Sequence, residues 1–304
     1  MTATGEQEEP GRAAGEALGL EVVGLEPCAG GDINRAFRLE LEDSRSAFLK
    51  CRPGADAVEF ADEAAGLAWL AEPAGLRVPE VLAVVEDPSW PGLVLEWVES
   101  GGALSPEGEE ELGRGLAVVH LSGAGHPGAR APGSDGETVR FGRATLAAPP
   151  ADGSRLTVSG LYSLRIEDLA RQALETGAIQ RGDAAAISRA AEEIDRFSGP
   201  PVPPARLHGD LWTGNMIADR DGRPWLIDPA PYGGHPEIDL AMLELFGAPS
   251  QRFLGAYREV APLADGAGER RLLWQIQPLL VHAVLFGGHY GAAAVRAALN
   301  YVGR

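Results

Sequence analysis

Short apolar runs, separated by glycine or by charged turns, dominate the first hundred residues of the chain. Runs of this length that are rich in Val, Leu and Phe and bounded by turn residues predict β-strands. Residues 57–71 instead carry apolar side chains at helical spacing, which predicts a single helix. Five strands are predicted around it, at residues 20–29, 34–42, 46–51, 80–87 and 92–99. The first part of the chain is therefore expected to form a five-stranded sheet with one helix inserted after the third strand.

A glycine-rich stretch at 100–104 separates this sheet from a mainly helical remainder, and we interpret it as a hinge. Ser105 and Pro106 follow it with the side chains typical of an N-cap and a first helical position. Residues 123–160 are rich in Gly, Pro, Ala and Ser, which predicts a mobile surface excursion. Further helices are predicted at 161–176, at 183–197 and from 237 onward, with two short strands at 214–219 and 224–228.

These elements predict an α+β fold in four parts. The parts are a flexible N-terminus at 1–15, a sheet lobe at 16–99, the hinge at 100–104 and a helical lobe at 105–304. Two lobes joined by a hinge leave a cleft between them, and such a cleft is where a ligand is expected to bind.

The strongly acidic balance of the chain limits its partners. The formal net charge is -18, whereas nucleic-acid backbones and anionic membranes attract Lys and Arg. We therefore expect no nucleic-acid partner and no membrane partner, but a small-molecule or protein substrate. The two cysteines form no disulfide framework and the acidic N-terminal residues do not look like a signal peptide, so a reducing, cytoplasmic location is expected.

The most informative stretch is LHGDLWTGNMIADRDGRPWLIDPA, at 207–230. Asp210 and Asn215 are five positions apart, and Asp228 follows the apolar residues WLI. Kinases space their catalytic loop and a later strand-ending aspartate in this way. In phosphoryl transfer one carboxylate accepts the substrate hydroxyl proton, while an amide oxygen and a second carboxylate hold Mg²⁺ on the phosphates. The pattern therefore predicts Asp210 as the catalytic base, Asn215 and Asp228 as metal ligands, and ATP as the phosphoryl donor.

Lys50 is the only lysine in the chain, and every other basic residue is arginine. It ends the third predicted strand, and Glu63 lies on the helix that follows. Kinases place a lysine on this strand to contact the nucleotide phosphates and a glutamate on the next helix to hold it. A compact ammonium fits between phosphate oxygens and a carboxylate, whereas the planar fork of arginine fits badly. Lys50 and Glu63 are therefore predicted to anchor ATP, although Glu59 and Asp62 lie on the same helix.

Two weaker signals lie near this pair. Gly30, Gly31 and Asp32 join the first two predicted strands, where glycine amides can approach phosphates closely. A Gly-Gly pair alone is typical of a hairpin turn, but its place before Lys50 favours nucleotide binding. The main-chain groups around Glu96 to Val98, just before the hinge, are predicted to meet the adenine edge.

Together these residues resemble the fructosamine kinase, or ketosamine-3-kinase, family, which has a protein-kinase-like fold and is related to the aminoglycoside phosphotransferases. The resemblance implies a bilobal fold, with a five-stranded antiparallel sheet and one helix in the N-terminal lobe and a larger, mainly helical C-terminal lobe. It rests on GGDIN (30–34), FLKC (48–51), LHGDLWTGN (207–215), LIDPA (226–230), GHPEIDLAMLELFG (234–247) and HAVLFGGHYG (282–291).

The resemblance implies ATP-dependent phosphorylation of the 3-hydroxyl of ketosamines, which are the adducts that reducing sugars form with amines. The 3-phosphate makes the adduct unstable and frees the amine, so the implied role is repair of glycated proteins or metabolites. The resemblance also implies that Trp212 stacks on the sugar or its linker. His208 is then expected to pack under the catalytic loop, and Asp239 to brace that loop by hydrogen bonds.

One region departs from the family pattern. Family members usually carry a tryptophan segment after a Phe-Gly pair such as Phe141-Gly142, but residues 156–174 lack tryptophan and offer only Tyr162. Because this region is expected to shape the acceptor pocket, two alternatives stay open. One is a kinase for another hydroxyl acceptor, such as an aminoglycoside or an amino-alcohol, and the other is a nucleotide-binding pseudokinase. The Trp212 motif favours a ketosamine acceptor, and the intact set of kinase residues counts against a pseudokinase.

Overall fold

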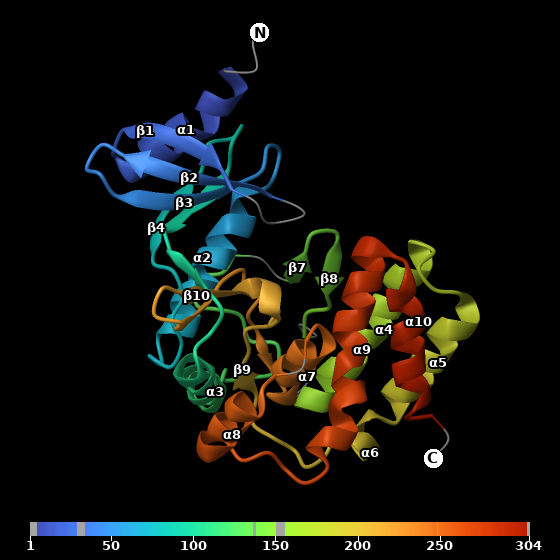
Figure 1. Ribbon diagram of the computed structural model, residues 1–304. Helices are drawn as coiled ribbons and strands as arrows, with labels where there is room; N and C mark the ends of the chain where they lie inside the picture. The colour runs from blue at the N-terminus through green and yellow to red at the C-terminus, as the bar shows by residue number, and fades with distance from the viewer. Residues whose placement is uncertain (1–4, 29–33, 136–137, 150–155, 248, 303–304) are drawn as a thin grey trace.

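The computed structural model describes residues 5–28, 34–135, 138–149, 156–247 and 249–302. The chain forms a small lobe built on a sheet and a larger lobe built mainly from helices (Figure 1). No described helix is both long and apolar enough to cross a membrane.

The small lobe contains the predicted five-stranded antiparallel sheet, with strand order β1-β2-β3-β5-β4. The strands are β1 (Val22–Pro27), β2 (Arg35–Leu41), β3 (Ser46–Cys51), β4 (Val81–Val85) and β5 (Gly92–Glu96). Alternate residues of β2 and β3 are buried against helix α1 (Gly5–Leu18), among them Leu39 and Leu49. The residues between them on β3, Phe48 and Lys50, therefore face the opposite side of the sheet, toward helix α2 (Ala57–Ala71).

The N-terminal segment differs from its prediction. Residues 1–15 are expected to be flexible, but the described part of this segment lies in α1, where Ala13 and Ala14 are buried in the small-lobe core. The indole of Trp90 also donates a hydrogen bond to Glu9 at 3.0 Å. Residues 9–15 thus contribute to the lobe, because this part of α1 packs on the sheet.

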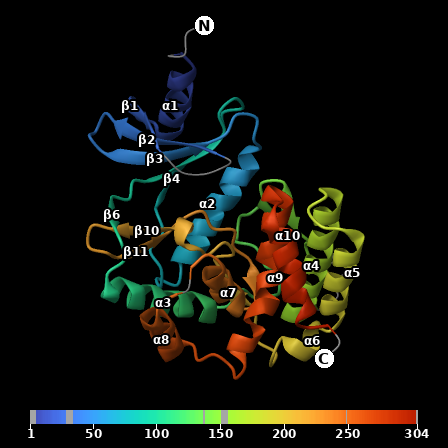
Figure 2. The ribbon, with the colours of Figure 1, turned by 45° about the vertical axis from the view of Figure 1, so that its right-hand side comes forward.

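The stretch interpreted as a hinge forms a short strand of the larger lobe. Strand β6 (Ser100–Gly102) pairs with β10 (Met216–Asp219), which pairs in turn with β11 (Pro224–Leu226). The residues that precede β10 and follow β11 in this three-stranded sheet carry the predicted kinase motif. Figure 2 shows α2 running from the small lobe toward this sheet, above helix α3 (Pro106–Leu121).

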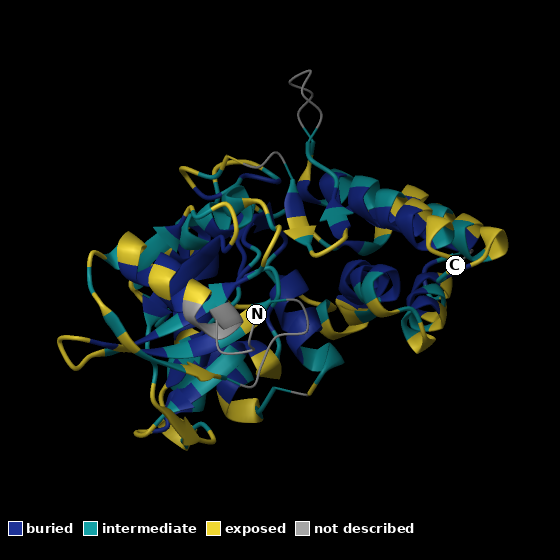
Figure 3. Cartoon of the chain, turned by 90° about the horizontal axis from the view of Figure 1, so that it is seen from above, coloured by how far each residue is buried: buried dark blue, intermediate teal, exposed yellow. Residues whose placement is uncertain are grey.

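The larger lobe is held together by helices whose facing sides are buried, as the burial colours in Figure 3 show. Its main core contains Trp274 and Tyr162, whose rings meet edge to face at 4.9 Å between centroids. The remaining helices are α4 (Val158–Glu175), α5 (Arg181–Glu192), α6 (Ile194–Phe197), α7 (Glu237–Leu245), α8 (Gln251–Val260), α9 (Ala267–Phe286) and α10 (His289–Leu299). The smallest elements are β9 (Ala205–Arg206), the 3₁₀ turn η1 (Thr213–Asn215) and β12 (Gly233–Gly234).

The predicted surface excursion at 123–160 is wrong for its central part. Strands β7 (Val139–Phe141) and β8 (Ala144–Leu146) form a hairpin there. Val139 and Leu146 are buried in the core of the larger lobe, so the hairpin is packed rather than free. Composition alone did not predict these strands, because a strand of three residues is too short to show an apolar pattern.

Candidate active site

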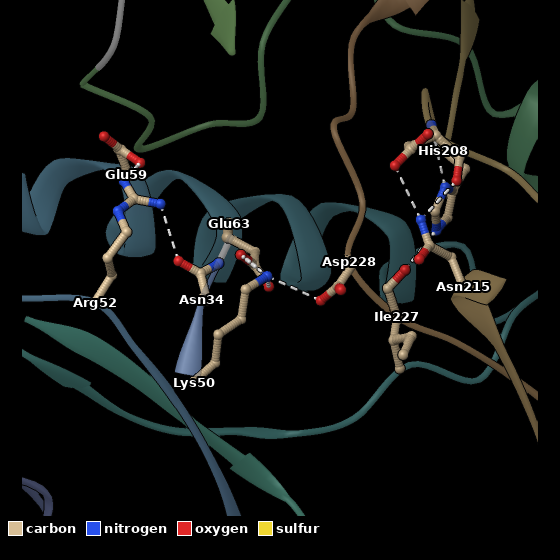
Figure 4. Close-up of polar contacts among 10 residues, drawn as sticks. Asn34, Lys50, Arg52, Glu59, Glu63, His208, Asn215, Ile227 and Asp228 are labelled. Atoms are coloured by element: carbon tan, nitrogen blue, oxygen red, sulfur yellow. Dashed lines mark hydrogen bonds and ion pairs between the residues drawn. The ribbon is translucent and has the colours of Figure 1, made fainter. Parts of the chain in front are cut away.

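Lys50 lies at the centre of an ion-pair cluster where the two lobes meet. Its ammonium donates to both carboxylate oxygens of Glu63, at 3.0 and 2.8 Å, and to Asp228 at 2.9 Å (Figure 4). These three bonds use every donor of the ammonium. Burial by itself favours loss of the proton, but the two carboxylates outweigh it and raise the pKa of Lys50. The structure thus joins a strand of the small lobe, helix α2 and the larger lobe through one cation.

Asp228 is held in an unusual backbone conformation. Its φ is 51°, in the left-handed region that non-glycine residues seldom adopt. The backbone on either side is fixed, because Ile227 N donates to Asn215 O at 3.0 Å and Ala230 N donates to His208 O at 2.9 Å. Strain of this kind persists where the surroundings determine it and is concentrated at functional sites. The turn directs the half-exposed carboxylate of Asp228 toward Lys50.

Asp210 lies on the loop between β9 and the turn η1. The Asn215 side-chain nitrogen donates to the Asp210 carboxylate at 3.0 Å and to its backbone oxygen at 2.9 Å. Burial of the carboxyl raises the pKa of Asp210 to about 7, and the nearby Asp228 adds to the shift although Asn215 opposes it. A carboxyl group with this pKa can take up a proton near neutral pH, as a general base must.

A tight backbone arrangement supports this loop. Gly209 has φ +82°, and a Cβ at this position would lie 2.0 Å from the carbonyl oxygen of Ala230. Only glycine therefore fits where the loop passes the segment that follows Asp228. His208 is buried beneath the loop, where its Nδ1 accepts from Asp210 N at 3.3 Å and its Nε2 donates to Ile227 O at 3.2 Å. Burial lowers the pKa of His208, so this imidazole is neutral.

Asp239, which is fully buried at the start of α7, ties the loop to the larger lobe. Its carboxylate accepts from His208 N at 2.7 Å and from Gly209 N at 3.0 Å. The same carboxylate lies 3.2 Å from His120 Nε2, and the other ring nitrogen of His120 is 2.8 Å from the Tyr257 hydroxyl. These are the loop hydrogen bonds that the family resemblance implies for Asp239.

We expect Asp239→Asn to destabilise the protein by about 1–3 kcal/mol, because its amide nitrogen then faces one of the two backbone N–H donors in a buried site. Turnover should fall with it, since the backbone just before Asp210 loses part of its support, whereas ATP binding should persist. Thermal unfolding and steady-state kinetics of the purified variant check both effects. Wild-type melting and turnover together would show that Asp239 does not support the loop.

Of the remaining predicted site residues, the structure describes three, and the other three lie outside the described residues. Trp212 is half-buried, two residues after Asp210, with its ring centroid 5.5 Å from that of Phe246. Glu96 ends β5 and is engaged with Glu80, since Glu96 N donates to Glu80 O and Glu80 N donates to the Glu96 carboxylate. Val98 follows it, half-buried. The predicted phosphate-contacting residues Gly30, Gly31 and Asp32 lie outside the described residues.

Sequence reasoning missed several contacts near the site. The aromatic rings of Trp212, Phe246 and His282 follow one another in space. The ring centroids of Phe246 and His282 are 4.8 Å apart. The sequence offers Phe246 only as part of ELFG and gives no periodic signal for it. On α2, Glu59 pairs with Arg52, which also donates to Asn34 at 2.9 Å (Figure 4). Those pairings depend on the tertiary structure and leave no motif in the sequence.

The side-chain oxygens of Asn215 and Asp228 suit a divalent cation that is shared with phosphates. Within the described ranges, no group of three or more His, Cys, Asp or Glu side chains could hold a metal ion. Asn215 uses its amide nitrogen on Asp210, so its amide oxygen is the atom that can serve as a ligand, beside the carboxylate of Asp228. Mg²⁺ in nucleotide sites takes one or two protein oxygens and completes its shell with phosphates and water. The donor set therefore fits Mg-ATP better than a resident metal.

This fold and site define a phosphotransferase of the protein-kinase-like class. Two solved structures share the fold at low identity. A macrolide 2'-phosphotransferase type I aligns with a TM-score of 0.62 and 18% identity, over 100% of this chain and 99% of its own. The choline kinase of Streptococcus pneumoniae aligns with a TM-score of 0.61 and 18% identity, over 98% of each chain.

The family model for fructosamine kinase matches residues 13–138 and 163–302, and the chain belongs to this family. A ketoamine kinase of Enterococcus faecium is 32% identical over 269 residues, covering 88% of this chain and 91% of its own. A chloroplastic protein-ribulosamine 3-kinase of Arabidopsis thaliana is 29% identical, covering 94% of this chain and 85% of its own. The crystal structure of a fructosamine-3-kinase from Thermobifida fusca aligns with a TM-score of 0.83 and 36% identity, over 95% and 98% of the two chains. The resemblance predicted from the sequence is confirmed, and membership of a kinase family implies that the protein uses ATP.

Proposed function

We propose that this protein is an ATP-dependent ketosamine 3-kinase, which phosphorylates the 3-hydroxyl of fructosamine or ribulosamine adducts. The observation that carries the proposal is the cluster of Lys50, Glu63 and Asp228 close to the Asp210–Asn215 pair, in a chain of the fructosamine kinase family. The relatives named as ketoamine kinase and protein-ribulosamine 3-kinase supply the acceptor class.

The proposed mechanism relies on positioning and electrostatics. ATP with Mg²⁺ supplies the phosphoryl group. Lys50 is the residue that would hold the nucleotide phosphates, with the donor that now bonds Asp228 turned to them, and Asn215 and Asp228 would hold the metal ion. Asp210, which is buried and has a raised pKa, accepts the proton of the 3-hydroxyl as this oxygen attacks the γ-phosphorus of ATP and ADP leaves. Such preorganised groups account for most of the rate enhancement in phosphoryl transfer, because the protein has little covalent chemistry to perform.

The aromatic side chains near Asp210 support the proposal that the acceptor is a sugar carrying an amine. Trp212 offers a half-exposed ring close to Asp210, and Phe246 and His282 extend the aromatic surface. Burial lowers the pKa of His282, so its neutral ring does not repel a cationic amine. A formal net charge of -18 also attracts a protonated amine, because the summed field of the protein raises the local concentration of cations.

The test is ADP release measured with Mg-ATP and three acceptors, namely a ribulose-lysine adduct, a fructose-lysine adduct and an aminoglycoside. We expect turnover on one or both ketosamines and none on the aminoglycoside, with phosphate on the 3-oxygen of the product by ³¹P NMR. Turnover on the aminoglycoside alone would move the function to another hydroxyl acceptor. ATP binding without turnover on any acceptor would instead indicate a pseudokinase.

A further inference from the structure

Helix α2, which carries Glu63, is attached to the larger lobe as well as to the sheet. Figures 1 and 2 both show it extending from beneath the sheet into the larger lobe. Near its first turns, Asp62 is held by one segment of the larger lobe. Arg130 Nη2 donates to Asp62 Oδ2 at 2.7 Å, and Asp135 N donates to Asp62 Oδ1 at 2.9 Å. Both carboxylate oxygens are therefore bound by residues 130–135, one position away from Glu63.

The rest of α2 is also packed closely against the larger lobe. A Cβ on Gly66 would lie 2.7 Å from the ring of Pro231, so the helix backbone runs directly against the segment that follows Asp228. At the end of the helix, Arg206 donates to Glu72 at 2.8 Å and its guanidinium lies 4.7 Å from the centroid of the Trp69 ring. The helix is thus fixed to the larger lobe along its length, and Asp62 makes the contact closest to Glu63.

The segment that holds Asp62 is connected in turn to the catalytic residues. Gly128 N donates to Gly233 O at 2.7 Å, and Gly233 N donates to Ala129 O at 2.8 Å. Gly233 belongs to β12, which pairs with β9 immediately before the Asp210 loop. Arg130 therefore extends from the backbone that supports the catalytic loop to the helix that supports Lys50.

Two buried polar groups near this contact have no hydrogen-bond partner among the described residues. They are the Nη1 atom of Arg130 and the Ser134 hydroxyl. The side chains of Arg130 and Asp62 are only 21% and 15% exposed, so solvent screens their attraction less than that of a surface pair. Departures from full polar satisfaction are expected at functional sites, where geometry is retained despite a loss in stability.

We propose that Arg130 is a positioning residue for phosphoryl transfer: through Asp62 it fixes α2, so that Glu63 keeps Lys50 against Asp228. The inference rests on the proposed kinase function and adds to it a contact from outside the known motifs. Because the Lys50 ammonium bonds Glu63 and Asp228 simultaneously, a small shift of α2 moves the cation away from its place. Displacements of about 1 Å in an active site lower the rate by about 100-fold.

The test compares Arg130→Met with Arg130→Lys, which keeps a cation of similar reach. The methionine variant should lower kcat by about 10–100-fold, with the KM for the ketosamine unchanged within about threefold, and lysine should restore part of the loss. Arg77→Met is the matched control, because the Arg77–Glu111 pair at 2.9 Å also links the segment before β4 to the larger lobe without touching Asp62 or Glu63. This control should keep the wild-type kcat.

A second readout does not depend on turnover. Since Lys50 is the only lysine, ¹⁵N-lysine labelling gives a single side-chain ammonium signal, which reports on its contacts with Glu63 and Asp228. Arg130→Met should shift or broaden this signal, and Arg77→Met should leave it in place. Wild-type kcat together with an unmoved Lys50 signal in Arg130→Met would overturn the inference.

If that variant fails to fold, Asp62→Asn, which removes the charge but keeps an acceptor for Asp135 N, gives the same comparison. If the wild type phosphorylates no ketosamine, the proposed function fails while the Lys50 signal still decides the positioning role.

Discussion

Replacing Lys50 with methionine is expected to lower kcat by about 10²–10³-fold, the range found when one charge-stabilising donor is removed from an active site. The ammonium is the only side-chain cation that the structure places against both Glu63 and Asp228, and its compact shape suits the phosphates. Lys50→Arg should fail to restore turnover, since a planar guanidinium cannot make the same three bonds. ADP release under saturating Mg-ATP and ketosamine measures the effect.

Stability needs a separate control, because the same substitution leaves Glu63 buried without its partner. The double variant Lys50→Met with Glu63→Gln removes that buried charge. It should regain much of the melting temperature lost by Lys50→Met, yet stay as inactive as the single variant. Wild-type turnover in either variant would show that Lys50 has no part in the reaction.

Asp210→Asn should lower kcat by about 10²–10⁴-fold, the contribution usual for a general base. Asparagine has nearly the same shape and can still accept the hydrogen bond from Asn215, so ATP binding should persist. Isothermal titration with Mg-ATP and single-turnover kinetics separate binding from transfer. Loss of nucleotide binding, with the fold intact, would assign Asp210 to the phosphate or metal site instead.

The same variant should be more stable than the wild type at neutral pH. Burial raises the pKa of Asp210 to about 7, so the folded protein holds this proton more tightly than the unfolded chain does. The wild type consequently loses stability as the pH rises from about 4 to about 7, where the buried carboxylate forms. Asparagine stays neutral, so the difference in free energy of unfolding should grow over this window to about 2–4 kcal/mol in favour of the variant. If the variant and the wild type differed by the same free energy of unfolding at pH 5 and at pH 8, the raised pKa of Asp210 would be contradicted.

The sequence predicted the parts of the site that follow local rules. Lys50 ends an apolar strand and Glu63 follows on an amphipathic helix, so their contact could be expected from the kinase pattern. The spacing of Asp210 and Asn215 within one loop likewise led to their pairing. Such contacts can be predicted because the residues lie on neighbouring elements whose geometry varies little.

Other contacts could not be predicted because they join segments that are distant in sequence. Arg130 lies in a stretch whose Gly and Pro content predicts only a loop, and nothing local indicates that it reaches Asp62 on α2. The N-terminal helix was missed for a different reason. Gly11, Gly15 and Pro10 argue against a helix by propensity, but the helix packs on the sheet through Ala13 and Ala14. Tertiary packing outweighed the weak local preference.

The chemistry of Lys50 also bears on damage to the protein itself. An amine attacks the carbonyl of a reducing sugar only in its uncharged form, and the side-chain amine of Lys50 is the only one in the chain. It is 12% exposed, and its pKa is raised by the carboxylates that surround it, so it is almost entirely protonated. The protein that we propose to act on sugar–amine adducts thus presents reducing sugars with no freely accessible lysine. The lysine that we predict to bind the phosphates is protected by its own charge from reacting with them.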